Sequence, residues 1–150
     1  MNSVLIILIQ FCFWFANPGL EISLAEKQDY AGGRAASGHG TKYNITVKAK
    51  TKHKKLIIEG VWLKGSTYFP VKVYDKFGKK DSEFKKGDEL FIAFRKHIKT
   101  NNQGQAIEQA TQQNAPIKYQ GEALLQYKLR GKTKYIAIKQ FAEKEKQLRQ

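Results

Sequence analysis

The chain contains very little cysteine, histidine and acidic side chain for its length. Cys12 is the single cysteine among 150 residues, which excludes an intramolecular disulfide framework and a zinc site built on cysteines. Three histidines and 13 acidic residues leave few groups for acid–base chemistry. No long apolar run follows residue 15, which excludes a protein with several membrane-spanning helices.

What the sequence has in excess is positive charge. Lysine and arginine number 27, which gives a formal net charge of +14, and lysine supplies nearly all of them. Hydrophobic residues make up 41% of the chain and aromatic residues 12%. This apolar content is sufficient for a folded core, so the chain is not a disordered polycation. The length allows one domain.

The amino-terminal segment is typical of an export signal. Residues 4–15, VLIILIQFCFWF, are apolar and uncharged, but they are fewer than the ~20 residues that a membrane-spanning helix needs. Such a segment fits the apolar part of a secretory signal. Ser23 and Ala25 are small residues at the positions that a signal peptidase reads, so residues 1–25 are predicted to be a signal peptide. Cleavage after Ala16, an uncleaved membrane anchor and a buried element of the fold are the alternatives.

The next segment, residues 26–42, is rich in glycine and small residues and has no apolar periodicity. This composition predicts a flexible linker. Residues 43–150 then form the expected basic β domain.

Alternation of apolar and polar residues predicts short strands in this domain. We expect six strands, near residues 43–50, 56–63, 69–74, 89–95, 123–129 and 135–141. Gly60 is expected to form a β-bulge, and Pro70 to lie at a sheet edge or near a strand start. The last two strands are expected to form a hairpin whose turn is Arg130-Gly131-Lys132. Residues 100–115 read as a loop with one helical turn around 106–112. Residues 142–150 are predicted to form a short charged helix or a frayed tail.

Six short strands without a long amphipathic helix predict an all-β fold, either a small antiparallel barrel or a sandwich of about six strands. The segment FKKGDELFIAF, residues 84–94, resembles the basic turn and following strand of SH3-like and OB-like (oligonucleotide-binding) barrels. This resemblance covers about a tenth of the chain and implies only the fold class.

Motifs for catalysis are absent from the sequence. It has no glycine-rich phosphate loop and no metal-binding signature, so we predict no catalytic residue, no cofactor and no metal ion. One enzymatic alternative stays open. His97 follows an expected strand and has basic neighbours, which disfavour its protonated form. A small secreted hydrolase would pair His97 with an acidic residue of the segment 75–89.

The excess of lysine predicts a basic surface on the sheet. The expected binding residues occupy outward strand positions and adjoining turns; they are Lys48, Lys50, Lys72, Tyr74, Lys128, Arg130 and Lys134. Such a surface attracts phosphate, lipid headgroups or acidic glycans. Four aromatic residues are interleaved with the bases and have rings that stack on bases or sugars, namely Trp62, Tyr68, Tyr74 and Phe77.

These observations favour an exported binding or structural module that is not an enzyme, in the periplasm or outside the cell. Its expected partner is an envelope protein or an anionic polymer, namely a glycan, a lipid headgroup or a nucleic acid. If residues 4–15 stay uncleaved, the protein is instead an anchored accessory subunit of an envelope transport or secretion assembly. The small hydrolase that uses His97 is the third alternative.

Overall fold

A computed structural model describes residues 19–32, 38–50, 52, 56–75, 84–108 and 110–148. All regular structure in these ranges is β-strand. The strands are β1 (Leu20–Ala31), β2 (His39–Ala49), β3 (Leu56–Leu63), β4 (Thr67–Pro70), β5 (Lys72–Tyr74), β6 (Glu89–Thr100), β7 (Ala106–Glu108), β8 (Thr111–Gln112), β9 (Ala123–Leu129), β10 (Lys132–Ile138) and β11 (Ala142–Leu148). The all-β prediction is therefore confirmed.

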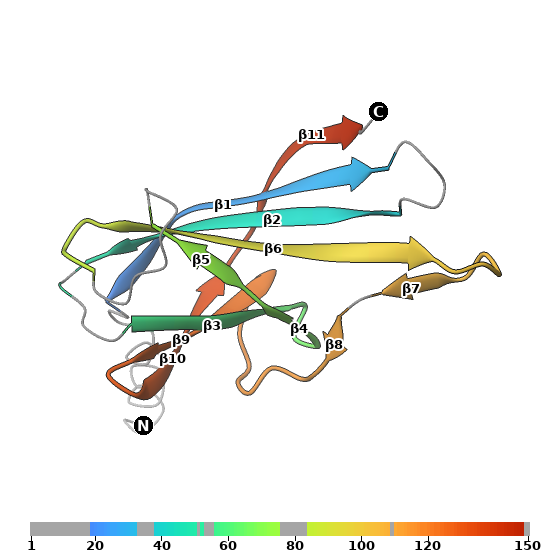
Figure 1. The fold of residues 1–150 in the computed structure, drawn as a ribbon. Helices are drawn as coiled ribbons and strands as arrows, with labels where there is room; N and C mark the ends of the chain where they lie inside the picture. The colour runs from blue at the N-terminus through green and yellow to red at the C-terminus, as the bar shows by residue number, and fades with distance from the viewer. Residues whose placement is uncertain are drawn as a thin grey trace, which may run out of the picture.

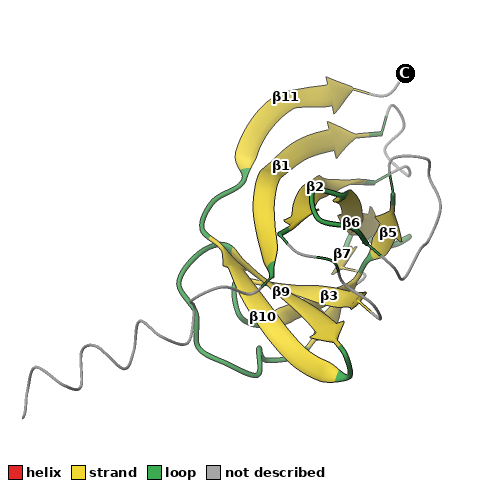
Figure 2. Ribbon diagram, turned by 90° about the vertical axis from the view of Figure 1, so that its left-hand side faces the viewer, coloured by secondary structure: helices red, strands yellow, loops and turns green. Residues whose placement is uncertain are grey.

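The strands form two sheets that lie one over the other (Figures 1 and 2). The six-stranded sheet has the order β11-β1-β2-β6-β5, with β7 beside β6, and the five-stranded sheet has the order β10-β9-β3-β4-β8. The sheets do not close into a barrel, so the sandwich is the alternative that the structure shows. The orders β1-β2-β6-β5 and β10-β9-β3-β4 correspond to the ABED and GFCC′ orders of immunoglobulin-type Greek-key sandwiches, and not to SH3-like or OB-like barrels.

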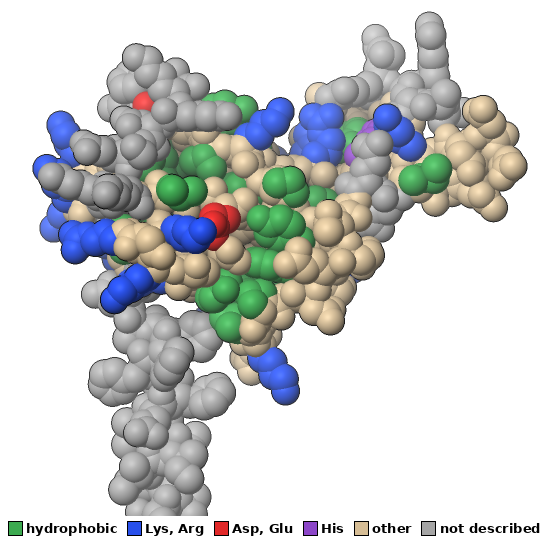
Figure 3. All heavy atoms as spheres, turned by 60° about the horizontal axis from the view of Figure 1, so that its bottom comes forward, with side chains coloured by type: hydrophobic (Ala, Val, Ile, Leu, Met, Phe, Trp, Pro, Cys, Tyr) green, Lys and Arg blue, Asp and Glu red, His purple; other side chains and the backbone are tan. Residues whose placement is uncertain are grey.

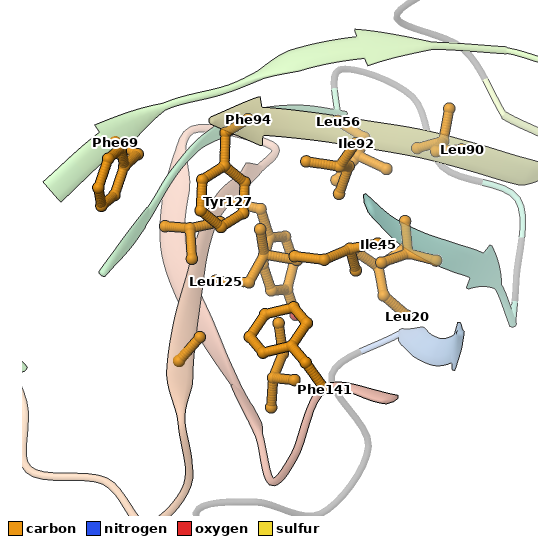
Figure 4. Packing of buried hydrophobic residues seen from close by; sticks show 14 of the residues in the cluster. Leu20, Ile45, Leu56, Phe69, Leu90, Ile92, Phe94, Leu125, Tyr127 and Phe141 are labelled. Atoms are coloured by element: carbon orange, nitrogen blue, oxygen red, sulfur yellow. The ribbon is translucent and has the colours of Figure 1, made fainter. Parts of the chain in front are cut away.

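The core lies between the inner faces of the two sheets (Figure 4). Alternate residues of β2 and β6, such as Ile45 and Ile92, meet Leu125 and Tyr127 of β9, and all four side chains are buried. Burying one such side chain stabilises the fold by about 1.5–3 kcal/mol. Period-two patterning therefore accounts for both the strands and the core.

Two of the passages from one sheet to the other are short corners. The strand expected at 69–74 is divided, because β4 belongs to the five-stranded sheet and β5 to the six-stranded sheet. Pro70 ends β4, since a residue without an N–H group cannot continue the hydrogen-bonded ladder. The second corner leads from β10 to β11 and is fixed by Phe141, which is buried in the core and whose N–H donates to Glu122 Oε2 over 2.6 Å.

The six-stranded sheet extends beyond the other sheet (Figure 1). β6 has 12 residues and β3 has 8, which correspond to lengths of about 40 Å and about 26 Å. We call the projecting part the arm, and it comprises residues 26–31, 39–44 and 95–100 with β7 and β11. Its inner face is not covered by the five-stranded sheet, as Figure 1 shows.

Two predictions based on composition are wrong. Residues 26–31 and 39–42 of the expected linker are strand, in β1 and β2; residues 33–37 lie outside the described residues. The predicted carboxy-terminal helix is strand β11, which pairs in parallel with β1. Both segments form strands although they are polar, because the arm is held together by backbone pairing and by side-chain contacts. One of these contacts is an ion pair of 2.5 Å between Lys144 and Glu26.

The prediction of a helical turn near residues 106–112 is also wrong, since this part of the chain contains β7 and β8. Other local predictions are confirmed. The pairing of β3 with β9 shifts register between Ile58 and Gly60, as expected for a bulge. Arg130 and Gly131 have φ angles of 52° and 77°, which are typical of a type I′ hairpin turn.

The predicted signal lies mostly in residues 1–18, outside the described residues. Residues 20–25, which it also included, form the first half of β1. Among the residues that the structure describes, none belongs to a helix of the length and apolarity required to cross a bilayer.

Candidate functional site

The residues of the predicted basic surface do not form one surface. Lys48 and Lys72 lie on the outer face of the six-stranded sheet with Tyr74, because their strand neighbours Val47 and Val73 point inward. Lys50 follows the end of β2 and is exposed.

The other three predicted residues belong to the five-stranded sheet. Lys134 pairs with the core residue Tyr127, whereas Lys128 is the next residue along β9 and points to the opposite face. Lys128 forms an ion pair of 2.9 Å with Glu59. Arg130 lies in the hairpin turn beyond both. The prediction that Lys128, Arg130 and Lys134 share a face with Lys48 and Lys72 is therefore wrong, because the two groups belong to different sheets.

His97 lies on the outer face of the arm and contacts a tyrosine. The Tyr30 hydroxyl is 2.5 Å from His97 Nδ1, and the two rings are nearly parallel, with centroids 5.9 Å apart. Partial burial, followed by the charges of Lys99 and Arg95, holds the pKa of His97 below its usual value. The lowered pKa favours the neutral imidazole, whose Nδ1 accepts a hydrogen bond from the Tyr30 hydroxyl in the tautomer that carries its proton on Nε2.

The acidic partners proposed for His97 in segment 75–89 lie far away where they are described. Glu89 begins β6, eight residues before His97, which corresponds to about 26 Å along the strand. Asp75 follows β5 near that same end of β6. Residues 76–83 lie outside the described residues. Glu89 and Asp75 are therefore not placed to pair with His97.

A groove opens where the five-stranded sheet ends and the arm continues. Its volume is about 600 Å³, which is within the range of small-molecule and cofactor sites. One wall is the arm, including β11. The other wall is the end of β3, the turn that follows it, and β4. The lining residues are Asp29, Tyr30, Ala31, His39, Gly40, Thr41, Tyr43, Leu63, Lys64, Ser66, Thr67, Phe69, Lys96, Ile98 and Lys146.

A row of polar side chains crosses the arm within this groove. Asp29 pairs with Thr41 across β1 and β2, and Thr41 pairs with Lys96 across β2 and β6. Residues paired in this way point to the same face of a sheet at ~5 Å intervals. Thr41 Oγ1 donates to Asp29 Oδ1 over 2.7 Å. The row therefore offers a hydrogen-bond acceptor at one end and a cation at the other.

Three lysines surround the groove from separate elements. Lys96 belongs to β6, Lys146 to β11 and Lys64 to the turn between β3 and β4. Lys64 has a φ of 51°, and its N–H donates to the Glu122 carbonyl over 3.1 Å, so the turn is tied to the hairpin of the second sheet. With Asp29, the lining has a formal charge of +2, histidine being neutral (three lysines less one aspartate). In Figure 3, basic side chains flank a histidine on the arm.

The base of the groove is apolar and rigid. Tyr43 stacks on Phe94 with ring centroids 4.7 Å apart, and Phe141 meets Tyr43 edge-on at 5.0 Å. Phe69, from the other sheet, lies 5.4 Å from Phe94. Burial raises the pKa of Tyr43 above its ordinary value. These contacts leave little freedom for the Tyr43 ring, so the polar row stands on a fixed base.

Two of the aromatic side chains expected to stack on a ligand, Trp62 and Tyr68, instead pack against other parts of the protein; Phe77 lies outside the described residues. Trp62 is 2% exposed, and its ring centroid lies 4.8 Å from that of Tyr68. The Tyr68 ring lies over Gly60, where a Cβ atom would come within 2.4 Å of it. The buried Trp62 indole nitrogen has no hydrogen-bond partner in the part of the chain that the structure describes. These two rings are therefore packing residues of the outer face.

Sequence reasoning missed the groove for a definite reason. Asp29 and Lys146 fall in segments predicted as linker and helix, and Lys64 follows a predicted strand in a turn. Only the alternation of Lys96 with Arg95 and His97 carried a signal, since it placed Lys96 on the inner face of its strand.

In the described ranges, no group of three or more histidine, cysteine or acidic residues is placed to hold a metal ion. Comparison with protein-family models, with curated proteins and with solved structures found no match.

Proposed function

We propose that this protein is an exported, non-catalytic binding module of the cell envelope, and that it acts through the groove between the arm and the β3–β4 turn. The observation that supports this proposal is the convergence of Lys64, Lys96 and Lys146, from three separate elements, around one concave, rigid site. This proposal replaces the basic surface expected on the sheet with a different set of lysines, those of the groove. The binding partner is an anionic polymer.

Long-range electrostatics support such a partner. The net charge of +14 attracts polyanions over about one Debye length, which is ~8 Å at physiological ionic strength. The charge is spread over the molecule, so it raises the rate of encounter without choosing a site. A concave site with several fixed cations focuses this field and gives the contact a defined position.

Export is proposed from the apolar segment 4–15, and β1 limits where processing takes place. Leu20 is 2% exposed and belongs to the core, and the Gly19 carbonyl accepts the Lys50 N–H over 2.9 Å. Cleavage after Ala25 would remove this half of β1. We therefore place the cleavage after Ala16, with retention as an anchored accessory subunit of an envelope assembly as the alternative.

The test compares two double variants that lose the same charge. Lys64→Gln with Lys96→Gln alters the groove, whereas Lys48→Gln with Lys72→Gln alters the outer face of the six-stranded sheet. Both are applied to immobilised heparin and eluted with a salt gradient, after their folding has been checked by circular dichroism.

We expect the groove variant to elute at clearly lower salt than the outer-face variant, because only the groove lysines surround a concave site. Equal elution of the two variants would show that retention depends on net charge alone and would refute a role for the groove.

A further inference from the structure

We infer that the ligand of the groove is an acidic oligosaccharide, a chain of sugars that carry carboxylates. This inference rests on the proposed function, since it names the class of polyanion that the groove would bind. It follows from the mixture of groups in the lining, from the position of the groove on the sheet, and from the absence of a free aromatic face among the described rings at its base.

The mixed charge of the lining suits a ligand that has both anionic and hydroxyl groups. Lys96, at one end of the polar row, has an ammonium group with three donors, so it can bind a ligand carboxylate in addition to a partner within the protein. Asp29, at the other end, is an acceptor for hydroxyl groups. A carboxylate offers about four acceptor sites, so Asp29 retains acceptor capacity beside its bond from Thr41. Ser66 and Thr67 add further hydroxyls on the opposite wall. A uronic acid presents a carboxylate and hydroxyls on one ring.

Nucleic acid fits this lining less well. Single-stranded nucleic acid is held by cations together with aromatic faces on which bases stack. At the groove, Tyr43 already stacks on Phe94 and receives the edge of Phe141.

An acidic peptide is disfavoured by the position of the groove. Extended peptides gain affinity by adding a strand to a free sheet edge. The polar row lies across β2, which is paired on both sides, with β1 and with β6, so its backbone groups are already hydrogen-bonded. The groove therefore offers side chains to a ligand and no strand edge.

The test measures binding of three probes by titration calorimetry at constant ionic strength: oligogalacturonate, poly-L-glutamate and single-stranded oligothymidylate. The protein carries the complete β1. The variants are Lys96→Gln, Asp29→Asn and the control Lys48→Gln on the outer face.

We expect wild type to bind oligogalacturonate more tightly than the other two probes. Lys96→Gln should weaken oligogalacturonate binding about tenfold, since a hydrogen bond to a charged group is lost. Asp29→Asn replaces one acceptor oxygen with an NH2 donor and removes the charge that strengthens a hydrogen bond from a hydroxyl group, so it should weaken binding of the sugar acid. Poly-L-glutamate has no hydroxyl groups and oligothymidylate has them only at its ends, so for these probes the lost repulsion should dominate and binding should become stronger.

Two outcomes separate this inference from the proposed function. If Asp29→Asn strengthens binding of all three probes, the groove is a basic site without preference for sugars, and only the present inference is overturned. If Lys96→Gln and Lys48→Gln weaken every probe equally, the groove is not the binding site and the proposed function fails as well.

Discussion

Removal of residues 1–25 should destabilise the sandwich, whereas removal of residues 1–16 should not. The shorter removal leaves β1 complete. The longer one deletes Leu20, which is 2% exposed, together with five more residues that pair β1 with β2 or bridge that pairing at its bulge. The gap left beside the buried Ala49 and Val47 would admit water to the core.

The size of the effect follows from Leu20 alone. Truncation of a buried leucine to alanine costs about 2–5 kcal/mol, and the loss of the strand ladder adds to this. For a domain of this size, 1 kcal/mol lowers the melting temperature by about 3–5 °C. The chain that begins at Glu26 should therefore melt at least ~6 °C below the chain that begins at Asn17.

Thermal unfolding followed by circular dichroism compares the two chains directly. Leu24→Gln in the longer chain is the matched control, because Leu24 lies in the same half of β1 but is 45% exposed. This substitution should change the melting temperature little. If the two truncated chains melt within about 1 °C of each other, residues 20–25 are not part of the cooperative fold, and cleavage after Ala25 again becomes compatible with the structure.

Two further predictions concern the corner and the arm. Phe141→Ala should lower the free energy of unfolding by about 3–5 kcal/mol in chemical denaturation, because Phe141 is 2% exposed and packs against Tyr43; a cost near zero would mean that the corner does not hold the sheets together. The pKa of His97 is lowered from 6.5 in the folded state, so the unfolded chain takes up the proton first as pH falls. This contribution to stability is complete above pH 6.5 and is lost as pH falls from there through the folded pKa. His97→Asn should reduce the slope of unfolding free energy against pH in that window, and an unchanged slope would contradict the assignment.

Much of the β structure could be predicted from the sequence, because strand periodicity is local. The alternation around Ile45 and Val47 is visible in seven residues, and Gly60 and Arg130–Gly131 mark a bulge and a turn whose geometry depends on their own backbone. The strands of the arm could not be predicted in this way, since they bury few side chains and therefore lack a regular alternation of apolar residues. A polar segment that is held by pairing with β2 looks in sequence like a linker.

The candidate site was decided by the tertiary structure. Asp29, Thr41 and Lys96 lie in one row only because β1, β2 and β6 pair in a particular register, and a shift of one residue would send Lys96 to the other face. Lys64 lines the groove because the β3–β4 turn of the five-stranded sheet lies against the arm, and Lys146 does so because the chain changes sheets at Phe141 and then pairs with β1 as β11. The sequence by itself determined the strands with a clear apolar period, the net positive charge and the lack of catalytic motifs. Which lysines meet depends on contacts between residues far apart in the chain, and local patterns do not encode these contacts.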